Sequence, residues 1–469
     1  MISFFSMKKK VTAIFIFLCF CSSSFSQETN LKLNKAMENF LADPLLKHAV
    51  TGFYVMNAAS GETVYKLNDE MGLAPGSTQK ILTAIAAFEL FGKDYTYKTD
   101  FDYTGTMSRD TLNGDIIIRG SGDPSLGSNL YPGTSPKQIF TQLADHLHDL
   151  GIRVIRGNIV VEAATPEIPG AWIWEDLGNY YGAASSGLNW RENTYDLHLR
   201  SGKKMGEPVT ILSVNNDPSF FLKFDNHVIS AEAGSGDQSY IYLPFHSSNF
   251  LIKGTIPVDK NDFVVHGSVK NPEAYFKYDL KKYLSNNINF IDSNSKIIDK
   301  KSDSNLKTIY TYKSPSLDSL IYFFLQKSIN LYGEAFLQKM AEKENQSFST
   351  EKGVITLQNF WERKGIEKSA LNIFDGSGLS PQNRITAASL VKALQYAKSQ
   401  SWYPAFYKAL PEFNQIKMKS GTINSVKAFT GYIHSSNGRT YIFAFIVNNY
   451  DSHQGKITQK MYEVLNALK

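Results

Sequence analysis

Apolar positions near the two ends of the chain follow strand and helix patterns that complement each other. Residues 30–49 have helical apolar spacing, and Gly52 to Asn57 and Glu62 to Leu67 are typical of a hairpin. Near the C-terminus, three strand-like segments precede a helix-like one: Ile416 to Thr422, Ala428 to Ile433, Thr440 to Asn448 and Lys456 to Lys469. We therefore expect one sheet built from both ends of the chain, with a large insertion between them.

The middle of the chain has a different pattern. From Tyr97 to about Tyr310, short alternating segments separated by Gly, Pro and Asn predict a β-rich region with one clear helix, Pro136 to Leu150. The expected strands are Asp115 to Arg119, Asn158 to Glu162, Thr194 to Leu199 and Val209 to Val214. A segment rich in Ser, Lys and Asp, Asp292 to Lys307, is expected to lead back to the first domain.

The first residues have the pattern of a secretory signal. A basic segment ends at Lys10, ten apolar residues run from Val11 to Phe20, and Ser24-Phe25-Ser26 precedes Gln27 as a small-x-small cleavage site. Ten residues are too few to span a bilayer, so we expect cleavage and no transmembrane segment afterwards. Phe20 lies where a lipoprotein signal needs a small residue before Cys21, which favours a soluble exported protein.

Composition excludes several classes of function. The chain is 42% hydrophobic and 20% charged, as in globular proteins. Cleavage would remove three lysines and no acid, so the formal charge would fall from +5 to +2. A chain so close to neutral has no electrostatic basis for binding nucleic acid. Both cysteines, Cys19 and Cys21, lie in the signal. The mature chain therefore has no disulfide, cysteine nucleophile or thiolate metal site.

Ser77 and Lys80 form a Ser-x-x-Lys pair at the start of a predicted buried helix, Ile81 to Phe91. Residues i and i+3 share a helix face, and a desolvated lysine can accept the proton of a serine hydroxyl. After the predicted signal, five other serines also have lysine three residues on. Only Ser77 follows a Pro-Gly break and opens a long apolar helix, where its own N–H can serve as an oxyanion donor.

Two further short motifs follow in the chain. Ser328-Ile329-Asn330 lies between two apolar helical segments, and its structural interpretation is an ordinary helix cap. Lys419-Ser420-Gly421-Thr422 ends a strand-like segment, where the missing side chain of Gly421 would let a substrate lie along the strand edge. Each motif alone is common by chance.

The order Ser-x-x-Lys, Ser-x-Asn, Lys-Ser-Gly resembles the three-part signature of serine penicillin-recognising enzymes. Four more segments fit one branch: Gly122-Asp123-Pro124-Ser125-Leu126, Trp172-Ile173-Trp174-Glu175-Asp176, Tyr181-Gly182-Ala183 and Asp375-Gly376-Ser377-Gly378-Leu379-Ser380. Over nearly the whole mature chain, the sequence resembles D-alanyl-D-alanine carboxypeptidase/endopeptidases of the class C, penicillin-binding protein 4 type. Ser420 departs from the threonine more usual there but keeps the hydroxyl.

The resemblance implies an α/β penicillin-recognising (β-lactamase/transpeptidase-like) domain, an antiparallel sheet with helices, carrying a large β-rich two-domain insertion. The expected boundaries are 1–26 for the signal, 27–96 and 311–469 for the peptidase domain, 97–194 and 266–310 for inserted domain II, and 195–265 for nested domain III. It also implies a periplasmic serine-type carboxypeptidase, a hydrolase of cell-wall peptidoglycan stem peptides that β-lactam antibiotics acylate, with no metal or organic cofactor.

The resemblance also implies the role of each motif residue. Ser77 would attack the penultimate D-Ala carbonyl while Lys80 takes its proton, and the N–H groups of Ser77 and Thr422 would hold the oxyanion. Ser328 and Lys419 would relay the proton to the leaving amine. Further expected roles are carboxylate binding for Lys419, orientation of the substrate amide and Lys80 for Asn330, and substrate contacts along the strand for Ser420 and Gly421. Asp176 and Tyr181 are expected to receive the free amine of a diaminopimelate-type side chain. The alternative is a structural role for both, with Asp176 capping a turn and Tyr181 lying in the core.

The residues also bear on several alternative sites and functions. His146 and His148 lie two positions apart on a predicted helix and so cannot share a metal. A Ser-His-Asp triad stays open by residue count, although no G-x-S-x-G elbow exists. A carbohydrate-binding role for the many tyrosines also stays open. Two rival functions are a β-lactamase or esterase using the same residues, and a catalytically silent wall-binding or β-lactam-sensing protein, against which the intact motifs argue.

Overall fold

A six-stranded antiparallel sheet joins the two ends of the chain, as predicted. The computed structural model describes residues 31–215, 223–244, 249–286, 288–291, 306–344, 347–451 and 454–469. The sheet order is β19-β20-β21-β22-β1-β2. Its strands are β1 (Val50–Asn57), β2 (Thr63–Leu67), β19 (Glu412–Phe413), β20 (Ile416–Ile423), β21 (Val426–His434) and β22 (Thr440–Asn448). The register Phe53 to Phe445 on β1 and β22 closes the sheet between residues almost 400 positions apart.

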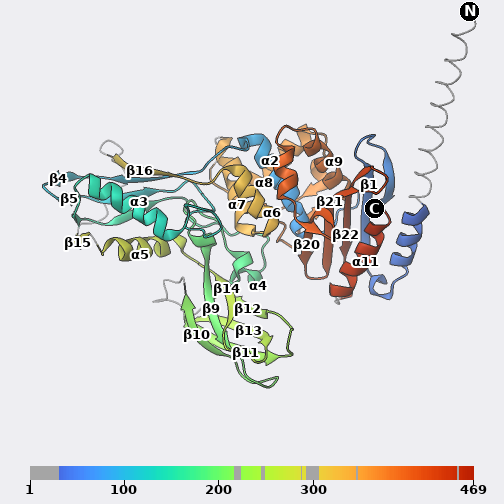
Figure 1. Ribbon diagram of the computed structural model, residues 1–469, viewed down its shortest axis with the longest axis horizontal. Helices are drawn as coiled ribbons and strands as arrows, with labels where there is room; N and C mark the ends of the chain where they lie inside the picture. The colour runs from blue at the N-terminus through green and yellow to red at the C-terminus, as the bar shows by residue number, and fades with distance from the viewer. Residues whose placement is uncertain are drawn as a thin grey trace, which may run out of the picture.

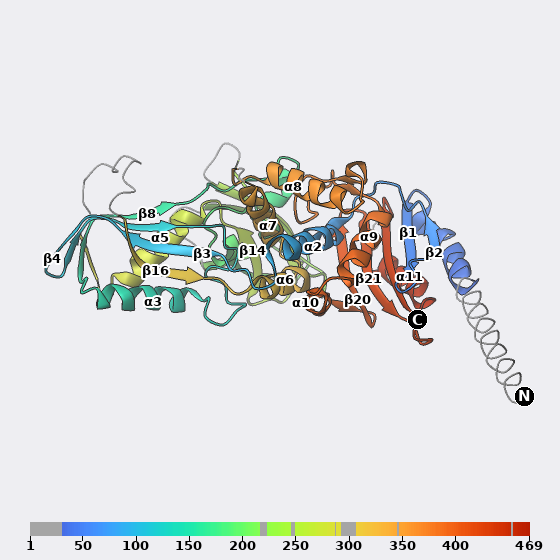
Figure 2. The ribbon, with the colours of Figure 1, turned by 90° about the horizontal axis from the view of Figure 1, so that it is seen from above.

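Helices cover both faces of this sheet, which is why its strands alternate between two cores. On β21, Ala428 and Tyr432 pack into one core and Phe429 and Ile433 into the other. One layer contains α2 (Lys80–Phe91), α6 (Leu317–Gln326), α7 (Asn330–Lys343), α8 (Thr350–Arg363), α9 (Ala387–Lys398) and α10 (Tyr403–Ala409). Residues 31–41 and α11 (Gln454–Asn466) form the other (Figure 2).

Helix α2 lies within its layer rather than on the surface. It contacts α6, α7, α8 and α9, and every residue from Lys80 to Phe88 is buried. This burial on all sides explains the uninterrupted apolar run in the sequence. It also means that the lysine at the start of α2 is held away from water.

The first and last parts of the insertion between α2 and α6 together form two four-stranded sheets. One contains β3 (Lys98–Tyr103), β6 (Ile116–Arg119), β8 (Ile159–Glu162) and β16 (Lys307–Lys313); the other contains β4 (Thr106–Ser108), β5 (Thr111–Asn113), β7 (Val154–Arg156) and β15 (Asn289–Ile291). The predicted helix appears as α3 (Pro136–Asp149). A second helix, α5 (Pro272–Leu284), was missed; its signals are the cap Asn271 and a proline in the first turn.

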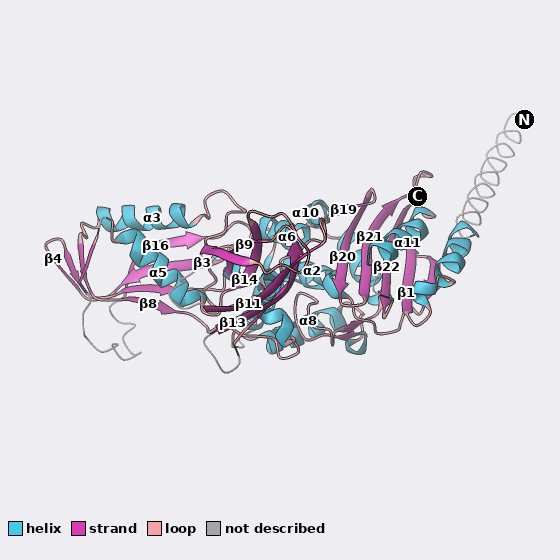
Figure 3. Cartoon of the chain, turned by 90° about the horizontal axis from the view of Figure 1, so that it is seen from below, coloured by secondary structure: helices cyan, strands magenta, loops and turns pink. Residues whose placement is uncertain are grey.

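A second group of strands projects from the first (Figure 1). It has two three-stranded sheets, made of β9 (Thr194–Arg200), β10 (Thr210–Asn215) and β14 (Phe263–Ser268), and of β11 (Lys223–Ala231), β12 (Gln238–Tyr242) and β13 (Asn249–Pro257). Tyr195, Leu197 and Leu199 of β9 alternate into a separate core. In Figure 3, which is seen from below, these strands lie in front of helices of the main sheet. We propose that the three groups of elements are the peptidase domain, domain II and domain III.

Some expectations concern residues that the structure does not describe. The predicted signal, residues 1–26, lies outside the described residues, and so does nearly all of the expected linker, whose last residue, Lys307, begins β16. Within the described ranges, no helix combines the length and apolar character needed to cross a membrane. No group of three potential metal ligands is found among the same residues.

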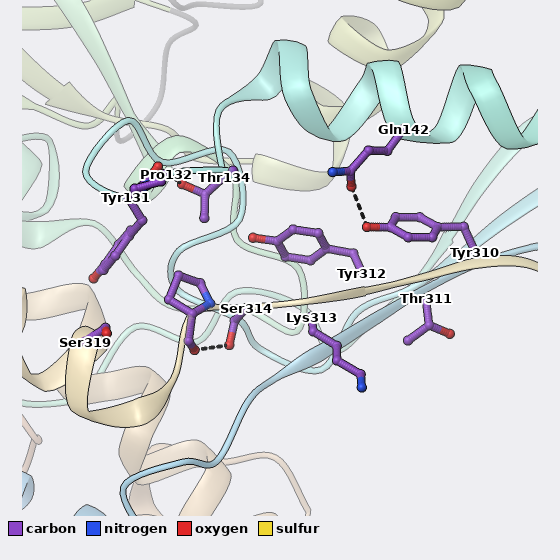
Figure 4. Close-up of a pocket in the computed structure, with 12 residues that line it drawn as sticks. Tyr131, Pro132, Thr134, Gln142, Tyr310, Thr311, Tyr312, Lys313, Ser314 and Ser319 are labelled. Carbon is purple, nitrogen blue, oxygen red and sulfur yellow. Dashed lines mark hydrogen bonds between the residues drawn. The ribbon is translucent and has the colours of Figure 1, made fainter.

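A cavity of about 460 Å³ lies where β16 leads back to α6, beside α3 (Figure 4). Its walls include Tyr131, Gln142, Tyr310, Tyr312, Ser314 and Ser319. The Tyr310 hydroxyl donates a hydrogen bond to Gln142 across it. None of the predicted site residues lines this cavity. Side-chain hydrogen bonds bring several of them together elsewhere.

Candidate active site

Ser77 lies on a short 3-10 helix, η2 (Gly76–Gln79), directly before α2. This helix packs against β20 so closely that glycine is required on both sides. A Cβ on Gly421 would lie 3.0 Å from the Ser77 nitrogen, and one on Gly76 would lie 2.8 Å from the Thr422 nitrogen. Gly76 also has a φ of +51°, which glycine adopts without strain. The contact brings the backbone nitrogens of Ser77 and Thr422 to neighbouring positions at the half-buried Ser77 side chain.

Lys80 is fully buried and makes three hydrogen bonds. Its Nζ lies 2.9 Å from Ser77 Oγ, 2.6 Å from Asn330 Oδ1 and 2.7 Å from the carbonyl oxygen of Ser377. The ring of Phe324 lies 5.8 Å from the same nitrogen. Burial lowers the pKa of Lys80 to about 7, although the negative charges of nearby carboxylates oppose this shift. A large fraction of the amine is therefore neutral near pH 7.

Asn330 links Lys80 to the insertion. It is the first residue of α7, and its Nδ2 donates to the carbonyl oxygen of Tyr181, 2.8 Å away. Ser328 precedes it with a φ of +58°, an uncommon conformation for serine. Its hydroxyl makes no hydrogen bond to any described residue, and Ile329 rather than Ser328 is the N-cap of α7. Ser328 therefore does not cap the helix, which was the ordinary structural role that its sequence pattern suggested.

Lys419 is the second dehydrated lysine of the site. It is 2% exposed on β20, and its Nζ donates to the Ser420 carbonyl oxygen, 2.9 Å away. Burial lowers its pKa well below the ordinary lysine value, and the positive charges of Lys80 and Lys427 add to the shift. The effect of the Lys80 charge on this pKa links Lys419 to the Ser77–Lys80 pair.

Asp375 organises the loop that supplies the Ser377 carbonyl group. It is fully buried, and its two oxygens accept five hydrogen bonds of 2.7–3.0 Å, from Gln79 Nε2, Gly378 N, Asn383 Nδ2, Trp172 Nε1 and Ser380 N. Trp172 belongs to the insertion, and Gln79 directly precedes Lys80. The segment Asp375 to Ser380, one of the four that support the sequence resemblance, therefore holds η2, this loop and the insertion together.

Glu334 is a buried carboxyl group that sequence reasoning missed. Both of its oxygens accept a hydrogen bond from the Gly376 nitrogen, at 3.0 and 3.1 Å. Burial and the charge of Asp375 raise the pKa of Glu334 to about 8. Its position four residues after Asn330, on the same helix face, is the signal that could have identified it.

Asp176 and Tyr181 lie next to each other on the insertion, on α4 (Trp174–Leu177) and η3 (Tyr180–Gly182). Burial, with the charge of Glu175, raises the pKa of Asp176 to about 6. Burial and the charge of Asp176 raise the pKa of Tyr181. The Asp176 carboxylate makes no hydrogen bond or ion pair with a described residue. The Tyr181 carbonyl group, in contrast, reaches the site through Asn330.

The structure brings most of the predicted residues together. Hydrogen bonds connect Ser77, Lys80, Asn330 and the Tyr181 backbone, and tight backbone packing adds Gly421 and Thr422. The Lys419 side chain makes no hydrogen bond to these described residues, but the positive charge of Lys80 contributes to lowering its pKa. The hydroxyl of Ser420 has no partner that links it to this set, and neither has that of Ser328.

Comparison with known proteins finds relatives that match nearly the whole chain. The D-alanyl-D-alanine carboxypeptidase of Actinomadura sp. (strain R39) is 23% identical over 462 residues, covering 90% of this chain and 82% of the relative. D-alanyl-D-alanine carboxypeptidase DacB of Haemophilus influenzae is 22% identical, and the alignment covers 92% of this chain and 91% of the relative. The crystal structure of penicillin binding protein 4 from the same organism shares the fold, with a TM-score of 0.75 at 20% identity over 90% of this chain and 97% of that chain.

The model of the D-Ala-D-Ala carboxypeptidase 3 (S13) family matches residues 33–412 and 413–468. The match includes the described site from Ser77 to Thr422 and both groups of inserted strands. The chain therefore belongs to the D-Ala-D-Ala carboxypeptidase 3 (S13) family of serine peptidases.

Proposed function

We propose that this protein is an exported, periplasmic serine peptidase that cleaves D-Ala-D-Ala bonds of peptidoglycan stem peptides through an acyl-enzyme on Ser77. The single observation that carries the proposal is the hydrogen-bonded contact between the Ser77 hydroxyl and the fully buried Lys80 amine. The relatives named as D-alanyl-D-alanine carboxypeptidases support the peptidase activity. Acylation of Ser77 by β-lactams belongs to the same proposal.

The hydrogen bonds of Lys80 explain how it acts as the base. A neutral lysine amine has two N–H donors and one lone pair, whereas the ammonium has three donors. The Asn330 Oδ1 and the Ser377 carbonyl oxygen can only accept, so they take the two donors. The lone pair is then left for the Ser77 hydroxyl proton. Lys80 removes this proton as Ser77 Oγ forms a bond to the penultimate D-Ala carbonyl carbon.

The negative charge that develops on the carbonyl oxygen is held by the backbone N–H groups of Ser77 and Thr422. Ser328 and Lys419 return a proton to the leaving amine as the C–N bond breaks. A lysine whose pKa is lowered by burial suits this transfer because it releases a proton more readily than an exposed lysine. Water then hydrolyses the acyl-enzyme. A leaving D-Ala makes the reaction that of a carboxypeptidase, and a leaving cross-linking diamino acid that of an endopeptidase.

Acylation should become faster as the pH rises through about 7, since the neutral form of Lys80 is the reactive one. Below this pKa the second-order rate constant for acylation by a fluorescent penicillin should rise about tenfold per pH unit, and it should level off above it. Stopped-flow fluorescence between about pH 5.5 and 8.5 measures this profile. A profile that is flat or falls with pH would show that Lys80 is not the base.

Asp176 and Tyr181 are proposed to bind the free amine of the diamino acid in the stem peptide. Burial without a partner is unfavourable for the Asp176 carboxylate, and an ammonium group would compensate it. The Tyr181 ring would pack beside the aliphatic part of the same side chain. The hydrogen bond from Asn330 to the Tyr181 carbonyl oxygen fixes this pocket relative to Lys80.

The change Asp176→Asn should lower kcat/KM about 10- to 150-fold for a peptide with the free amine, because a hydrogen bond to a charged group is lost. The N-acetylated form of the same peptide, and penicillin acylation, should change less than about twofold. Release of D-Ala from both peptides measures the difference. A uniform fall in all three rates would mean that Asp176 is structural and that the amine binds elsewhere.

A further inference from the structure

Lys427 lies beside the proposed oxyanion donors but has no role in the reaction described above. It is the cross-strand partner of Thr422 in the antiparallel pair of β20 and β21. Directly opposite residues of such a pair have their side chains on the same face of the sheet. Accordingly, Lys427 Nζ donates to Thr422 Oγ1 over 2.9 Å, and the same nitrogen lies 5.1 Å from the Phe429 ring centre.

The charge of Lys427 is not compensated within the described chain. No described carboxylate lies within 4.0 Å of its Nζ, so its recorded partners are a hydroxyl group and an aromatic ring. Partial burial lowers the pKa of Lys427, and desolvation is the only cause. A half-buried ammonium without an anionic partner is unfavourable, and a carboxylate from a ligand would stabilise it and raise its pKa again.

The position of Lys427 matches the distance at which a substrate would present a carboxylate. In a peptide that ends in D-Ala-D-Ala, only one N–Cα unit separates the reacting carbonyl carbon from the terminal carboxylate carbon, a span of about 4 Å. If the Thr422 N–H binds the carbonyl oxygen, the carboxylate falls within one residue of Thr422 along the edge of β20. The Thr422 hydroxyl and the Lys427 ammonium lie at this point.

The other two lysines of the site are less suited to this task. Lys80 is surrounded by Ser77, Asn330 and Ser377 and is 0% exposed. Lys419, to which the sequence analysis gives a share in carboxylate binding, is 2% exposed and donates to a backbone carbonyl group. Burial lowers the pKa of all three lysines, but only Lys427 is exposed enough for a substrate carboxylate to reach it and stabilise its charged form.

We infer that Lys427, together with the Thr422 hydroxyl, forms the subsite that binds the free C-terminal carboxylate of the substrate. The inference rests on the proposed function, since it places the scissile carbonyl group at Ser77 and Thr422. It makes Lys427 a substrate-binding residue that selects chain ends over internal peptide bonds, and it leaves proton transfer to Lys419.

The test compares one peptide ending in D-Ala-D-Ala with the same peptide ending in D-alaninamide, using Lys427→Ala, Lys427→Arg and Lys419→Ala. Lys427→Ala should lower kcat/KM for the free acid about 10- to 100-fold and that for the amide less than about threefold. Lys427→Arg keeps the charge and should restore most of the loss. Lys419→Ala should lower both substrates alike. Lys417→Ala is the matched control, since Lys417 lies on β20 and pairs with Glu412 instead; it should change neither rate.

Thermal unfolding of each variant shows whether it is folded. Equal losses on the acid and the amide, or no loss on either, in a folded Lys427→Ala protein would overturn the inference while leaving the proposed function intact. Selective loss of the acid in Lys419→Ala but not in Lys427→Ala would also overturn it. A wild-type protein that releases D-Ala from neither peptide would instead contradict the proposed function, and the inference with it.

Discussion

Replacing Ser77 with alanine is expected to lower D-Ala release at least about 10⁴-fold and to abolish covalent labelling by a fluorescent penicillin. The change removes one half-buried oxygen whose recorded side-chain hydrogen bond is to Lys80. The core residues of α2 are untouched, so the thermal midpoint should stay within about 2 °C of the wild type. Steady-state release of D-Ala and fluorescence after denaturing gel electrophoresis measure the two activities.

Ser201→Ala is the matched control for this variant. Ser201 also has a lysine three residues on, but it lies beside β9, where its hydroxyl accepts a hydrogen bond from the Lys260 nitrogen. The control should keep both activities within about twofold. Persistent labelling of a folded Ser77→Ala protein would exclude Ser77 as the nucleophile.

The second large effect is expected at Lys80. Lys80→Met keeps the approximate length of the side chain but removes the base, and it should slow penicillin acylation about 10²- to 10⁴-fold. Lys80→Arg keeps the positive charge but cannot be deprotonated in a protein, so it should be as inactive as the methionine variant. Stopped-flow acylation at about pH 8 compares the two with the wild type, and circular dichroism checks that they are folded.

The arginine variant decides between two roles of Lys80. Acylation by Lys80→Arg at more than about a tenth of the wild-type rate would mean that Lys80 contributes a charge or a structural contact rather than accepting a proton. An inactive arginine variant in a folded protein is the outcome that general-base catalysis requires.

The sheet could be predicted from the sequence because its signals are local. Alternating apolar residues mark β20, β21 and β22, and the hairpin of β1 and β2 has a short polar turn at Ala58-Ala59-Ser60-Gly61. Helix α5 was missed because the alternating segments around it suggested strands. Residues 30–49 were expected to form one helix, whereas the helix ends at residue 41 and a 3-10 turn, Pro44–Leu46, follows after the cap Asp43.

Only the local part of the site could be predicted, because contacts between distant residues leave no pattern in the sequence. Ser77 and Lys80 are neighbours on one helical turn, so their spacing in the sequence already implies contact. Asp375 and Glu334 contact the site across nearly 300 and 260 residues of chain, and nothing local marks a buried carboxyl group as a partner of a distant loop. The pKa of Lys80 could not be predicted from the sequence either, because it depends on burial near the Phe324 ring and on the charges of these two carboxyl groups.

The central claim is that Ser77 forms the acyl-enzyme of a peptidase rather than of a β-lactamase, and mass spectrometry of the penicillin-treated protein tests it most directly. Trypsin is expected to release Leu67–Lys80, whose only hydroxyl side chains are Ser77 and Thr78. Thr78 is fully buried and its hydroxyl donates to the Pro75 carbonyl oxygen, so it is not free to react. We expect one penicillin adduct on Ser77 in this peptide, persisting for minutes or longer. An adduct on another peptide or no adduct would contradict Ser77 as the acylated residue, and an adduct that turns over within seconds would identify a β-lactamase.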